Sequence, residues 1–370
     1  MILTEIARQF QVEGRLFNIE PLGHGNVNDT YLVIFRTVFS EMKFVLQKIN
    51  QFVFKKPELV MKNMHTVTRH VHMILESEQE EADRIWQLPR VIPTRDGGDY
   101  FIDDEGNYWR AISQIASAHS YEKVRNADHA HEVGAVLGEF HHAISTLSTE
   151  LLADTLPGFH VTPGYFKQLD EALATPDGQA RLNGSKTASN VLKFIEARRP
   201  WASVLEDARE RGELLERPIH GDPKTANIMI DDVTGKGTSI IDLDTVKPGL
   251  LLYDLGDCLR SCCNPGGEEA RDFNEIFFDT DLCEALLGGY LKYAKDALTD
   301  GDKKYMYDTI KLISYELGLR FFADFLAGDK HFKVREPGLN LLRARVQIRL
   351  CTSIEAREST IRRILDKLLS

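Results

Sequence analysis

The residues whose types and spacing suggest chemistry lie in one stretch of the second half of the chain, Pro218-Ile-His-Gly-Asp-Pro-Lys-Thr-Ala-Asn-Ile-Met-Ile230. A second acidic segment, Ile240-Ile-Asp-Leu-Asp-Thr245, follows after a short gap. Phosphoryl transfer from ATP needs a carboxylate that orients and deprotonates a hydroxyl group, and oxygen ligands for Mg²⁺. The two segments offer both kinds of group, so phosphoryl transfer is the chemistry that they predict.

Each polar residue of the pattern H-x-D-x-K-x-x-N has a predicted role. Asp222 is the candidate catalytic base, and Asn227 and Asp242 are candidate Mg²⁺ ligands. Lys224 is placed to neutralise charge on the transferred phosphoryl group. Asp244 would join the metal ligands or bind substrate if the segment after Asp242 is extended, because alternate residues of a strand face the same side. The competing interpretation is a polar loop of solvated carboxylates, which would not need these residue types to coincide.

The charge of the chain excludes some partners. Its 370 residues contain 45 Lys and Arg against 56 Asp and Glu, a net charge of -11 at pH 7. The chain therefore lacks the excess of basic residues typical of a nucleic-acid-binding protein. Any anionic ligand must be bound by a local group such as a glycine loop, a metal ion or a few placed cations. No apolar run is long enough for a transmembrane helix, and the N-terminus lacks the basic start of a secretory signal. The five cysteines match no zinc spacing and are expected to be reduced thiols of a cytoplasmic protein.

The sequence pattern changes from β-type to helical along the chain. Short β-type runs with turn signals occupy 17–19, 30–35, 44–49 and 108–112, and a helix is expected over 56–77. Beyond residue 120 the periodicity predicts helices at 133–144, 188–207, 282–298, 304–327 and 338–368, with one β-hairpin over 228–241. His141 and His142, near the end of the first of these helices, are expected to pack on its face or to meet solvent. We therefore expect an α+β fold with a small β-rich lobe, 1–116, and a large, mainly helical lobe, 117–370.

A glycine-containing loop precedes the second β-type run, in the sequence Gly23-His-Gly-Asn-Val-Asn-Asp-Thr-Tyr31. Gly23 and Gly25 would let the backbone approach phosphate oxygens, which exposed N–H groups can bind. Asn28 and Thr30 are further candidate nucleotide contacts in this segment. The pattern is not G-x-G-x-x-G, and a plain hairpin turn is the alternative.

The next strand, Phe44-Val-Leu-Gln-Lys-Ile49, contains two candidates for the residue that contacts the ATP phosphates. Protein kinases place a Lys on this strand and pair it with a Glu on the following helix. Letter spacing nominates Lys48, whereas the apolar alternation puts Gln47 inward, and only one of two neighbours can reach the nucleotide. His65 stands where the Glu would be, so we expect no Lys–Glu switch.

These motifs resemble the phosphotransferase family of aminoglycoside and choline kinases, which has the protein-kinase-like fold. The resemblance is closer still to the N-acetylhexosamine 1-kinases in the segments EPLGHGNVNDTYLV, IDLDTVKPGLLLYDLGDCLR, LGLRFFADFLAGDKHF and NLLRARVQIRL, and it spans about residues 5 to 355. It implies a bilobal protein-kinase-like fold, ATP and Mg²⁺ as cofactors, and a small sugar as acceptor. The phosphorylated group would be the anomeric hydroxyl of an N-acetylhexosamine.

The resemblance also implies roles for individual residues. The glycine-containing loop would cover ATP and face the sugar, with Asn26 as a contact, and the linker residues Gln114 and Ala116 would read adenine through their backbone. Asp254 would brace the catalytic loop, with His220 in a structural role. The sugar would meet Asp222, Asp244 and Arg320. Arg320 lies among large apolar residues, where a cation must be paired or ligand-bound, and a salt bridge to Asp324 is the alternative.

Two other functions compete with a sugar kinase. The acidity of the chain favours a cationic acceptor, as in an aminoglycoside or choline kinase, although choline would need an aromatic cage that no clustered aromatic residues mark. The missing Lys–Glu pair favours a degenerate kinase fold that binds nucleotide without turnover, whereas the intact Asp222, Asn227 and Asp242 argue against it. We expect no nucleic-acid or membrane partner, and a monomer or weak dimer.

Overall fold

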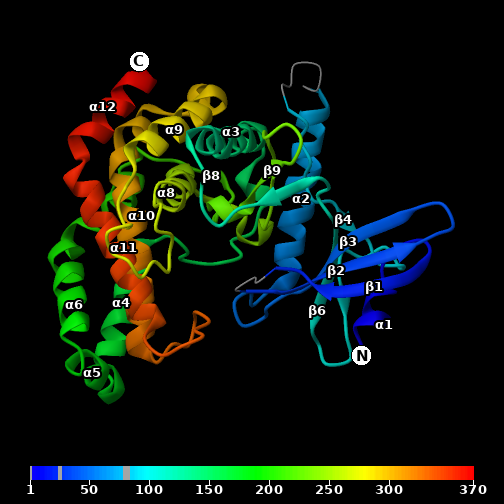
Figure 1. Cartoon of the computed structure of the whole chain (residues 1–370), viewed down its shortest axis with the longest axis horizontal. Helices are drawn as coiled ribbons and strands as arrows, with labels where there is room; N and C mark the ends of the chain where they lie inside the picture. The colour runs from blue at the N-terminus through cyan, green and yellow to red at the C-terminus, as the bar shows by residue number, and fades with distance from the viewer. Residues whose placement is uncertain (1, 24–26, 78–83) are drawn as a thin grey trace.

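The computed structural model describes residues 2–23, 27–77 and 84–370. Its N-terminal part is an antiparallel sheet in which the strands follow the spatial order β1 (Arg15–Pro21), β2 (Asp29–Arg36), β3 (Glu41–Lys48), β6 (Tyr108–Ser113) and β4 (Val91–Ile92), with β5 (Phe101–Ile102) paired to β6. Figure 1 shows this sheet beside helix α1 (Leu3–Ala7), apart from the helical bulk of the chain.

The sheet forms because apolar side chains alternate along its strands. Val33 and Phe35 on β2 face Phe44 and Leu46 on β3 within one buried cluster. Trp109 from β6 closes the same cluster. The alternate residues of these strands therefore point to the opposite face of the sheet, toward the rest of the molecule.

Helix α2 (Pro57–Ser77) follows β3 in the chain and lies between this sheet and the larger part of the molecule (Figure 1). Its buried residues recur at helical spacing and belong to the large core cluster rather than to the small one. Asn63, which is 1% exposed, donates hydrogen bonds to the carbonyl oxygens of Ala153 and Val246, both at 2.8 Å. Polar bonds in addition to apolar packing thus fix α2 on the larger part.

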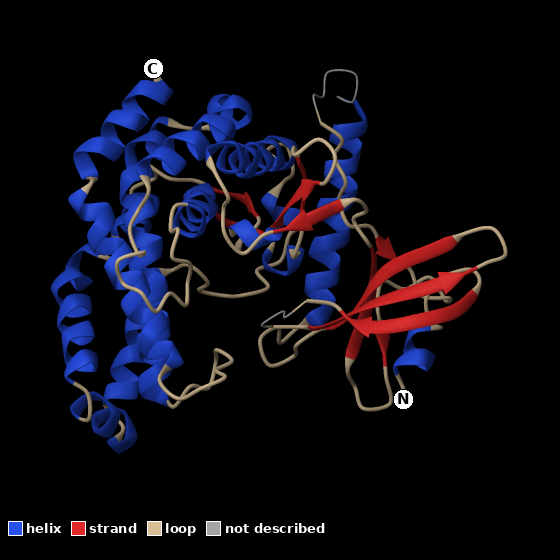
Figure 2. Ribbon diagram, viewed as in Figure 1, coloured by secondary structure: helices blue, strands red, loops and turns tan. Residues whose placement is uncertain are grey.

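The larger part is mainly helical (Figure 2). Its α-helices are α3 (Ala127–Ile144), α4 (Thr162–Leu173), α5 (Pro176–Asn183), α6 (Lys186–Arg198), α7 (Val204–Glu210), α8 (Leu251–Cys262), α9 (Thr280–Ala294), α10 (Asp300–Ala327), α11 (Leu339–Ala356) and α12 (Glu358–Leu369). Short 3₁₀ helices are η1 (Thr149–Leu151), η2 (Arg199–Trp201), η3 (Thr225–Asn227), η4 (Leu243–Thr245) and η5 (Lys295–Ala297). Helices α3 and α9 pack so closely that a Cβ at Gly134 would lie 1.9 Å from the oxygen of Leu286.

Two small sheets position the loops that carry the predicted motif. Strands β10 (Gly237–Ile240), β9 (Ile228–Asp231) and β7 (Ala118–Ser120) form one, and β11 (Lys247–Leu250) pairs with β8 (Glu216–Ile219) in the other. One motif loop joins β8 to β9, and the other joins β10 to β11. The pairing of these strands therefore brings the two loops together.

The predicted α+β architecture, a small β-rich region with a larger helical one, is confirmed. In the described part of the chain, no helix combines the length and apolar character needed to cross a membrane. All five cysteines are buried free thiols.

Candidate active site

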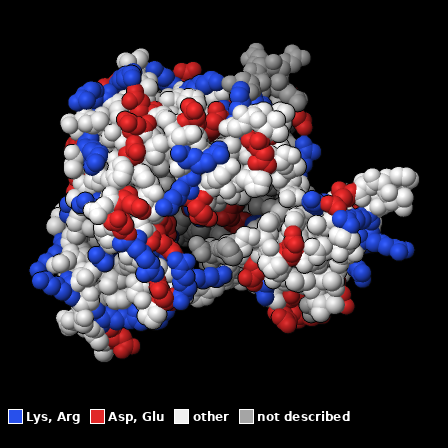
Figure 3. Space-filling view, viewed as in Figure 1, with Lys and Arg blue, Asp and Glu red and all other residues white. Residues whose placement is uncertain are grey.

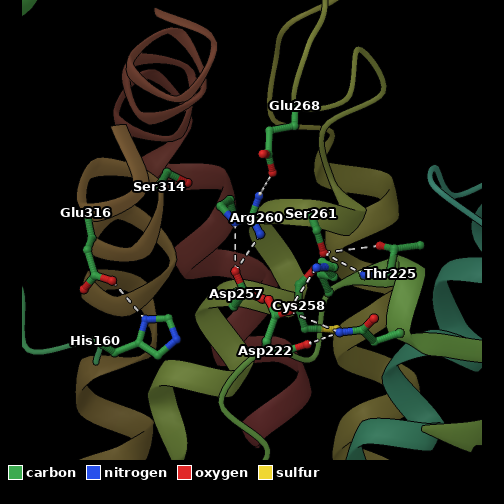
Figure 4. A network of polar contacts seen from close by, with 12 residues as sticks. His160, Asp222, Thr225, Asp257, Cys258, Arg260, Ser261, Glu268, Ser314 and Glu316 are labelled. Atoms are coloured by element: carbon green, nitrogen blue, oxygen red, sulfur yellow. Dashed lines mark hydrogen bonds and ion pairs between the residues drawn. The ribbon is translucent and has the colours of Figure 1, made fainter. Parts of the chain in front are cut away.

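The loop between β8 and β9 carries Asp222 at its centre (Figure 4). Lys224 donates to Asp222 Oδ2 at 3.0 Å. Asn227 donates through Nδ2 to the backbone oxygen of Asp222 at 2.7 Å. Because the amide nitrogen of Asn227 is used within the loop, its Oδ1 atom is left to face a ligand.

The charges of this loop are mutually stabilised. Desolvation opposes ionisation of Asp222, but the adjacent Lys224 ammonium outweighs it and lowers the pKa of the carboxyl group. The Asp222 carboxylate in turn raises the pKa of Lys224. Both groups are therefore charged at neutral pH, and 28% of the Asp222 side chain is solvent-exposed, so a substrate can reach it.

Asp254, in the first turn of α8, holds the start of the same loop. Its two oxygens accept the backbone N–H of His220 at 2.6 Å and that of Gly221 at 2.7 Å. His141 also donates to Asp254, at 2.9 Å, and its other ring nitrogen contacts the Tyr290 hydroxyl at 3.0 Å. The expectation that His141 merely packs or meets solvent is thus incomplete, because the ring is fully buried and supports the brace.

His220 joins the two motif loops. Its Nε2 atom donates to the backbone oxygen of Ile241 at 3.0 Å, and its Nδ1 atom accepts the backbone N–H of Asp222 at 3.2 Å. Burial lowers the pKa of His220, which keeps the ring neutral and fits one nitrogen donating and the other accepting. His220 therefore ties the base loop to the strand end that precedes Asp242.

Asp242 has the properties of a cation ligand. It adopts the left-handed backbone conformation, with φ of 66°, two residues after the end of β10. Although solvent reaches its side chain, desolvation by the surrounding walls and the nearby Asp244 carboxylate raise its pKa to about 6. Among the described residues, none makes a hydrogen bond to this carboxyl group. Mg²⁺ prefers carboxylate and amide oxygens, so Asp242 and Asn227 Oδ1 fit the ion.

The structure corrects the prediction for Asp244. The segment after Asp242 is not extended, because the left-handed residue leads directly into η4, which turns Asp244 away from the metal side. Asp244 is 2% exposed, and its Oδ2 atom accepts Asn28 Nδ2 at 2.6 Å. Its Oδ1 atom lies 2.5 Å from Arg110 Nη1. Both oxygens are thus occupied by protein groups, and neither is free for metal or substrate.

Strand β3 presents Gln47, and not Lys48, to this cluster. Gln47 Nε2 donates to Thr30 Oγ1 at 3.1 Å, and Gln47 Oε1 accepts two hydrogen bonds from Arg110, at 2.7 and 2.9 Å. Lys48 follows on the same strand and therefore faces the opposite side of the sheet. Arg110 was not among the predicted site residues, although a cation between apolar residues is the same signal that singled out Arg320.

The linker and the glycine-containing loop are placed only in part. The backbone N–H and carbonyl oxygen of Ala116 are hydrogen-bonded to the side chain of Gln87, at 3.2 and 3.1 Å, so both groups already have a partner within the protein. No such contact involves the backbone of Gln114 within the described part of the chain, and it stays the candidate adenine reader. Gly23 takes φ of 69°, and the predicted contacts Gly25 and Asn26 lie outside the described residues.

Arg320, on α10, lies among aromatic rings beside the catalytic loop. Its guanidinium carbon is 4.9, 5.0 and 5.6 Å from the ring centres of Phe159, Tyr165 and Phe332. Its ionic partner is Glu316, at 3.6 Å, and not the predicted Asp324. Asp324 instead accepts backbone N–H groups after the end of α10.

His160 links Glu316 to the catalytic loop (Figure 4). One ring nitrogen lies 3.0 Å from Glu316 Oε1, and the other lies 2.8 Å from the backbone oxygen of Gly221. Both partners only accept, so both nitrogens must carry a proton. Burial opposes this charge, but Glu316 outweighs burial and raises the pKa of His160. A cation is therefore built in beside the base.

A second ion pair lies next to Asp222 in Figure 4. Arg260 donates to Asp257 Oδ1 at 2.6 and 3.0 Å and reaches Glu268 at 3.5 Å. Within the described residues, the buried Asp257 Oδ2 atom has no hydrogen-bond partner.

The space between the two regions of the protein is hollowed, with acidic side chains on its wall (Figure 3). A cavity of about 1050 Å³ lies elsewhere, against the linker and the turn between β9 and β10. It contacts Gln114 but none of the motif carboxylates. This cavity is therefore not where the predicted catalytic residues lie.

The fold and this site together define a kinase-like phosphotransferase that acts on an alcohol acceptor. The chain belongs to the phosphotransferase enzyme family, which matches residues 18–286. The predicted kinship with aminoglycoside and choline kinases is thereby confirmed at the level of the family.

Solved structures with low sequence identity share the fold. An aminoglycoside phosphotransferase from Alicyclobacillus acidocaldarius is 13% identical, with a TM-score of 0.62 and coverage of 99% of this chain and 97% of that one. A microcompartment-associated aminopropanol kinase is 17% identical, with a TM-score of 0.59 and 97% of both chains covered. An ethanolamine kinase from Plasmodium vivax is 13% identical, with a TM-score of 0.52 and coverage of 89% and 82%. The protein-kinase-like fold is thus confirmed.

Proposed function

We propose that this chain is an ATP- and Mg²⁺-dependent kinase that phosphorylates a neutral sugar, most specifically the anomeric hydroxyl of an N-acetylhexosamine. Asp222 accepts the proton of the sugar hydroxyl as that oxygen attacks the γ-phosphorus. Lys224 compensates charge on the transferred group. Asn227 and Asp242 hold Mg²⁺, which supplies charge neutralisation on the triphosphate.

The acceptor preference rests on the surroundings of Arg320. Its guanidinium fills the space among three aromatic rings, where a cationic acceptor would otherwise bind. The carboxylates on this side already have cationic partners, because Glu316 is bonded to His160 and Asp257 to Arg260. A neutral polyol avoids repulsion from these cations. This arrangement supports a sugar over an amine.

An amino alcohol or aminoglycoside is the alternative acceptor. The net charge of -11 favours a cation, and structures with the same fold are described as aminopropanol and ethanolamine kinases. A catalytically degenerate nucleotide-binding protein is less well supported, because Lys224 and Asn227 are both hydrogen-bonded to Asp222, and Asp242 is close enough to Lys224 to interact with it electrostatically. The proposal includes the division into lobes at residues 116 and 117, a cytoplasmic monomer or weak dimer, and no nucleic-acid or membrane partner.

An ADP-release screen tests the acceptor. It would compare GlcNAc, GalNAc, glucose, galactose, choline, ethanolamine, aminopropanol and kanamycin, with the phosphorylated position read by NMR. We expect turnover with an N-acetylhexosamine and phosphate on its anomeric oxygen. Turnover with amines alone would replace the sugar assignment, and no turnover with any acceptor would favour the degenerate protein.

Asp222→Asn tests the base. The change should abolish turnover while ATP affinity stays within about threefold, because the amide keeps the size of the side chain but cannot take the proton. Asp104→Asn, an exposed position in a loop of the sheet region, is the matched control. Turnover retained in Asp222→Asn would remove Asp222 from the role of base.

A further inference from the structure

Arg110 is the largest fully buried side chain of the described residues, at 1% exposure. It lies on β6, within the small sheet, and its partner Asp244 lies on η4, in the larger part of the chain. The two side chains meet at 2.5 Å. A buried ion pair thus connects the sheet region to the loop that carries Asp242.

Arg110 is held in place by its strand neighbours. Gln47 is its register partner on β3 and accepts two of its hydrogen bonds. Gln47 also receives support from Thr30 on β2, its own register partner on that side. This sequence of contacts runs across three strands and ends at Asp244, so the guanidinium cannot easily leave its position.

Asp244 carries the connection on to the base of the glycine-containing loop. Its second oxygen accepts Asn28 Nδ2 at 2.6 Å, and Asn28 Oδ1 accepts the backbone N–H of Asn50 at 3.0 Å. Nδ2 of Asn50 in turn donates to the backbone oxygen of Val27 at 3.1 Å. One carboxylate therefore fixes the end of this loop relative to the metal side of the site.

The Lys–Glu pair of protein kinases has no counterpart on β3 and α2. Gln47 occupies the inward position of the strand, and α2 contains only Glu58 and Glu76, near its two ends. The carboxylates of Asp222 and Asp242 belong to the proposed catalytic and metal side, and the carboxylate of Asp244, although turned away from that side, is close enough to act on Asp242 electrostatically. Lys224 neutralises the charge of Asp222. Another cation must neutralise the charge of Asp244 if an anionic nucleotide is to bind nearby.

We propose that Arg110 is a positioning residue for nucleotide binding that takes the place of the Lys–Glu pair. It neutralises Asp244 and holds it against Asn28, so that the described end of the glycine-containing loop, at Val27 and Asn28, is fixed and no uncompensated third carboxylate repels the phosphates. Arg110 acts through Asp244 and does not touch the phosphates. This inference rests on the proposed kinase function.

The test compares wild type with Arg110→Met, Asp244→Asn and the double variant. The dissociation constants of Mg-ATP and of adenosine are measured by calorimetry, and the unfolding temperature is measured in parallel. Arg110→Met leaves a buried carboxylate unpaired and should weaken Mg-ATP binding about tenfold or more, with adenosine binding unchanged. The double variant removes both charges and should return Mg-ATP affinity to within about threefold of wild type. Lys43→Met, an exposed cation of the same sheet, is the control.

Each outcome is decisive. If the double variant binds Mg-ATP as weakly as Arg110→Met, Arg110 contacts the phosphates itself and the proposal is overturned. A lower unfolding temperature with unchanged binding of both ligands would reduce Arg110 to a structural residue and also overturn it. If Arg110→Met does not fold, the Asp244→Asn and double variants still test the proposal. Both lack the Asp244 charge, so both are expected to bind Mg-ATP, and weak binding by both would overturn the proposal. A wild type that binds no ATP would instead contradict the kinase function, independently of Arg110.

Discussion

The carboxylate of Asp254 accepts the backbone N–H of His220 at 2.6 Å, so the first turn of α8 fixes the peptide from which the catalytic loop starts. The contact is fully buried and also involves Gly221 and His141. Both oxygens of Asp254 thus accept at least one hydrogen bond. The conformation of the loop that presents Asp222 depends on a carboxylate and not simply on a polar residue of that size.

We therefore expect Asp254→Asn to impair turnover more than binding. The amide nitrogen would face a donor and leave one buried N–H unpaired, at a cost of about 1–3 kcal/mol. The displaced loop should lower kcat about tenfold or more, with the KM for ATP changed by less than about threefold. Steady-state kinetics and thermal unfolding check this, with the exposed Asp104→Asn as control. An unchanged kcat would show that the brace has no influence on the base.

The ionised Asp242 carboxylate is expected to lower the stability of the metal-free protein while it allows metal binding. Its pKa is raised to about 6, so the folded protein without metal binds a proton more readily than the unfolded chain and loses stability as the pH rises from about 4 to about 6. Asp242→Asn should raise the free energy of unfolding of the metal-free protein at neutral pH by about 1 kcal/mol, which corresponds to about 2 °C in the unfolding temperature. This value is smaller than the full pKa shift would give, because solvent reaches the side chain.

The same variant should gain nothing from Mg-ATP, which stabilises only a protein that binds it. Thermal unfolding at about pH 5 and about pH 7.5, with and without Mg-ATP, measures both effects, and the stabilisation should be smaller at the lower pH. A gain that is equal at both pH values would come from the left-handed backbone, which Asn tolerates well, and would contradict the electrostatic explanation.

The pair of His160 and Glu316 predicts a second pH dependence, in which stability also falls as the pH rises. The pKa of His160 is raised by Glu316, so the pair stabilises the fold fully below the ordinary histidine value, and this contribution is lost as the pH rises through the higher folded value. His160→Asn suits the left-handed backbone at this position, with φ of 65°, but removes the charge. The unfolding temperature should fall more at about pH 6 than at about pH 9. The exposed His65→Asn is the control, and a difference that is constant with pH would exclude a protonated His160.

The fold could be read from the sequence where periodicity was strong. The helix expected over 56–77 is α2, and the hairpin expected over 228–241 is formed by β9 and β10. The helix expected over 188–207 is broken after Arg198, because Pro200 removes a donor, and the one expected over 338–368 is broken at Arg357. Helices α4 and α5 were missed, since their buried residues are few and become informative only in contact with α10.

The site was predictable only where chemistry is local in sequence. The roles of Asp222 and Asn227 follow from one short motif, and the structure brings these residues together. Asp244 was misplaced because a spacing of two residues assumes an extended chain, and the left-handed Asp242 is visible only in three dimensions. Arg110, His141 and His160 were missed as site residues, because their partners are at least 61 positions away in sequence.

Arg320 gives the last prediction, which concerns the acceptor alone. The guanidinium lies among the rings of Phe159, Tyr165 and Phe332, on α10 in the larger part of the chain and not in the proposed nucleotide-covering sheet, so its loss should affect the sugar and not ATP. Arg320→Gln should raise the KM for the acceptor about tenfold or more, the worth of a hydrogen bond from a charged group, with the KM for ATP unchanged. Arg320→Lys should rescue only partly, because an ammonium cannot stack on the rings in the same way. Arg362→Gln, at an exposed position on α12, is the control, and an equal rise in both KM values would remove Arg320 from the acceptor site.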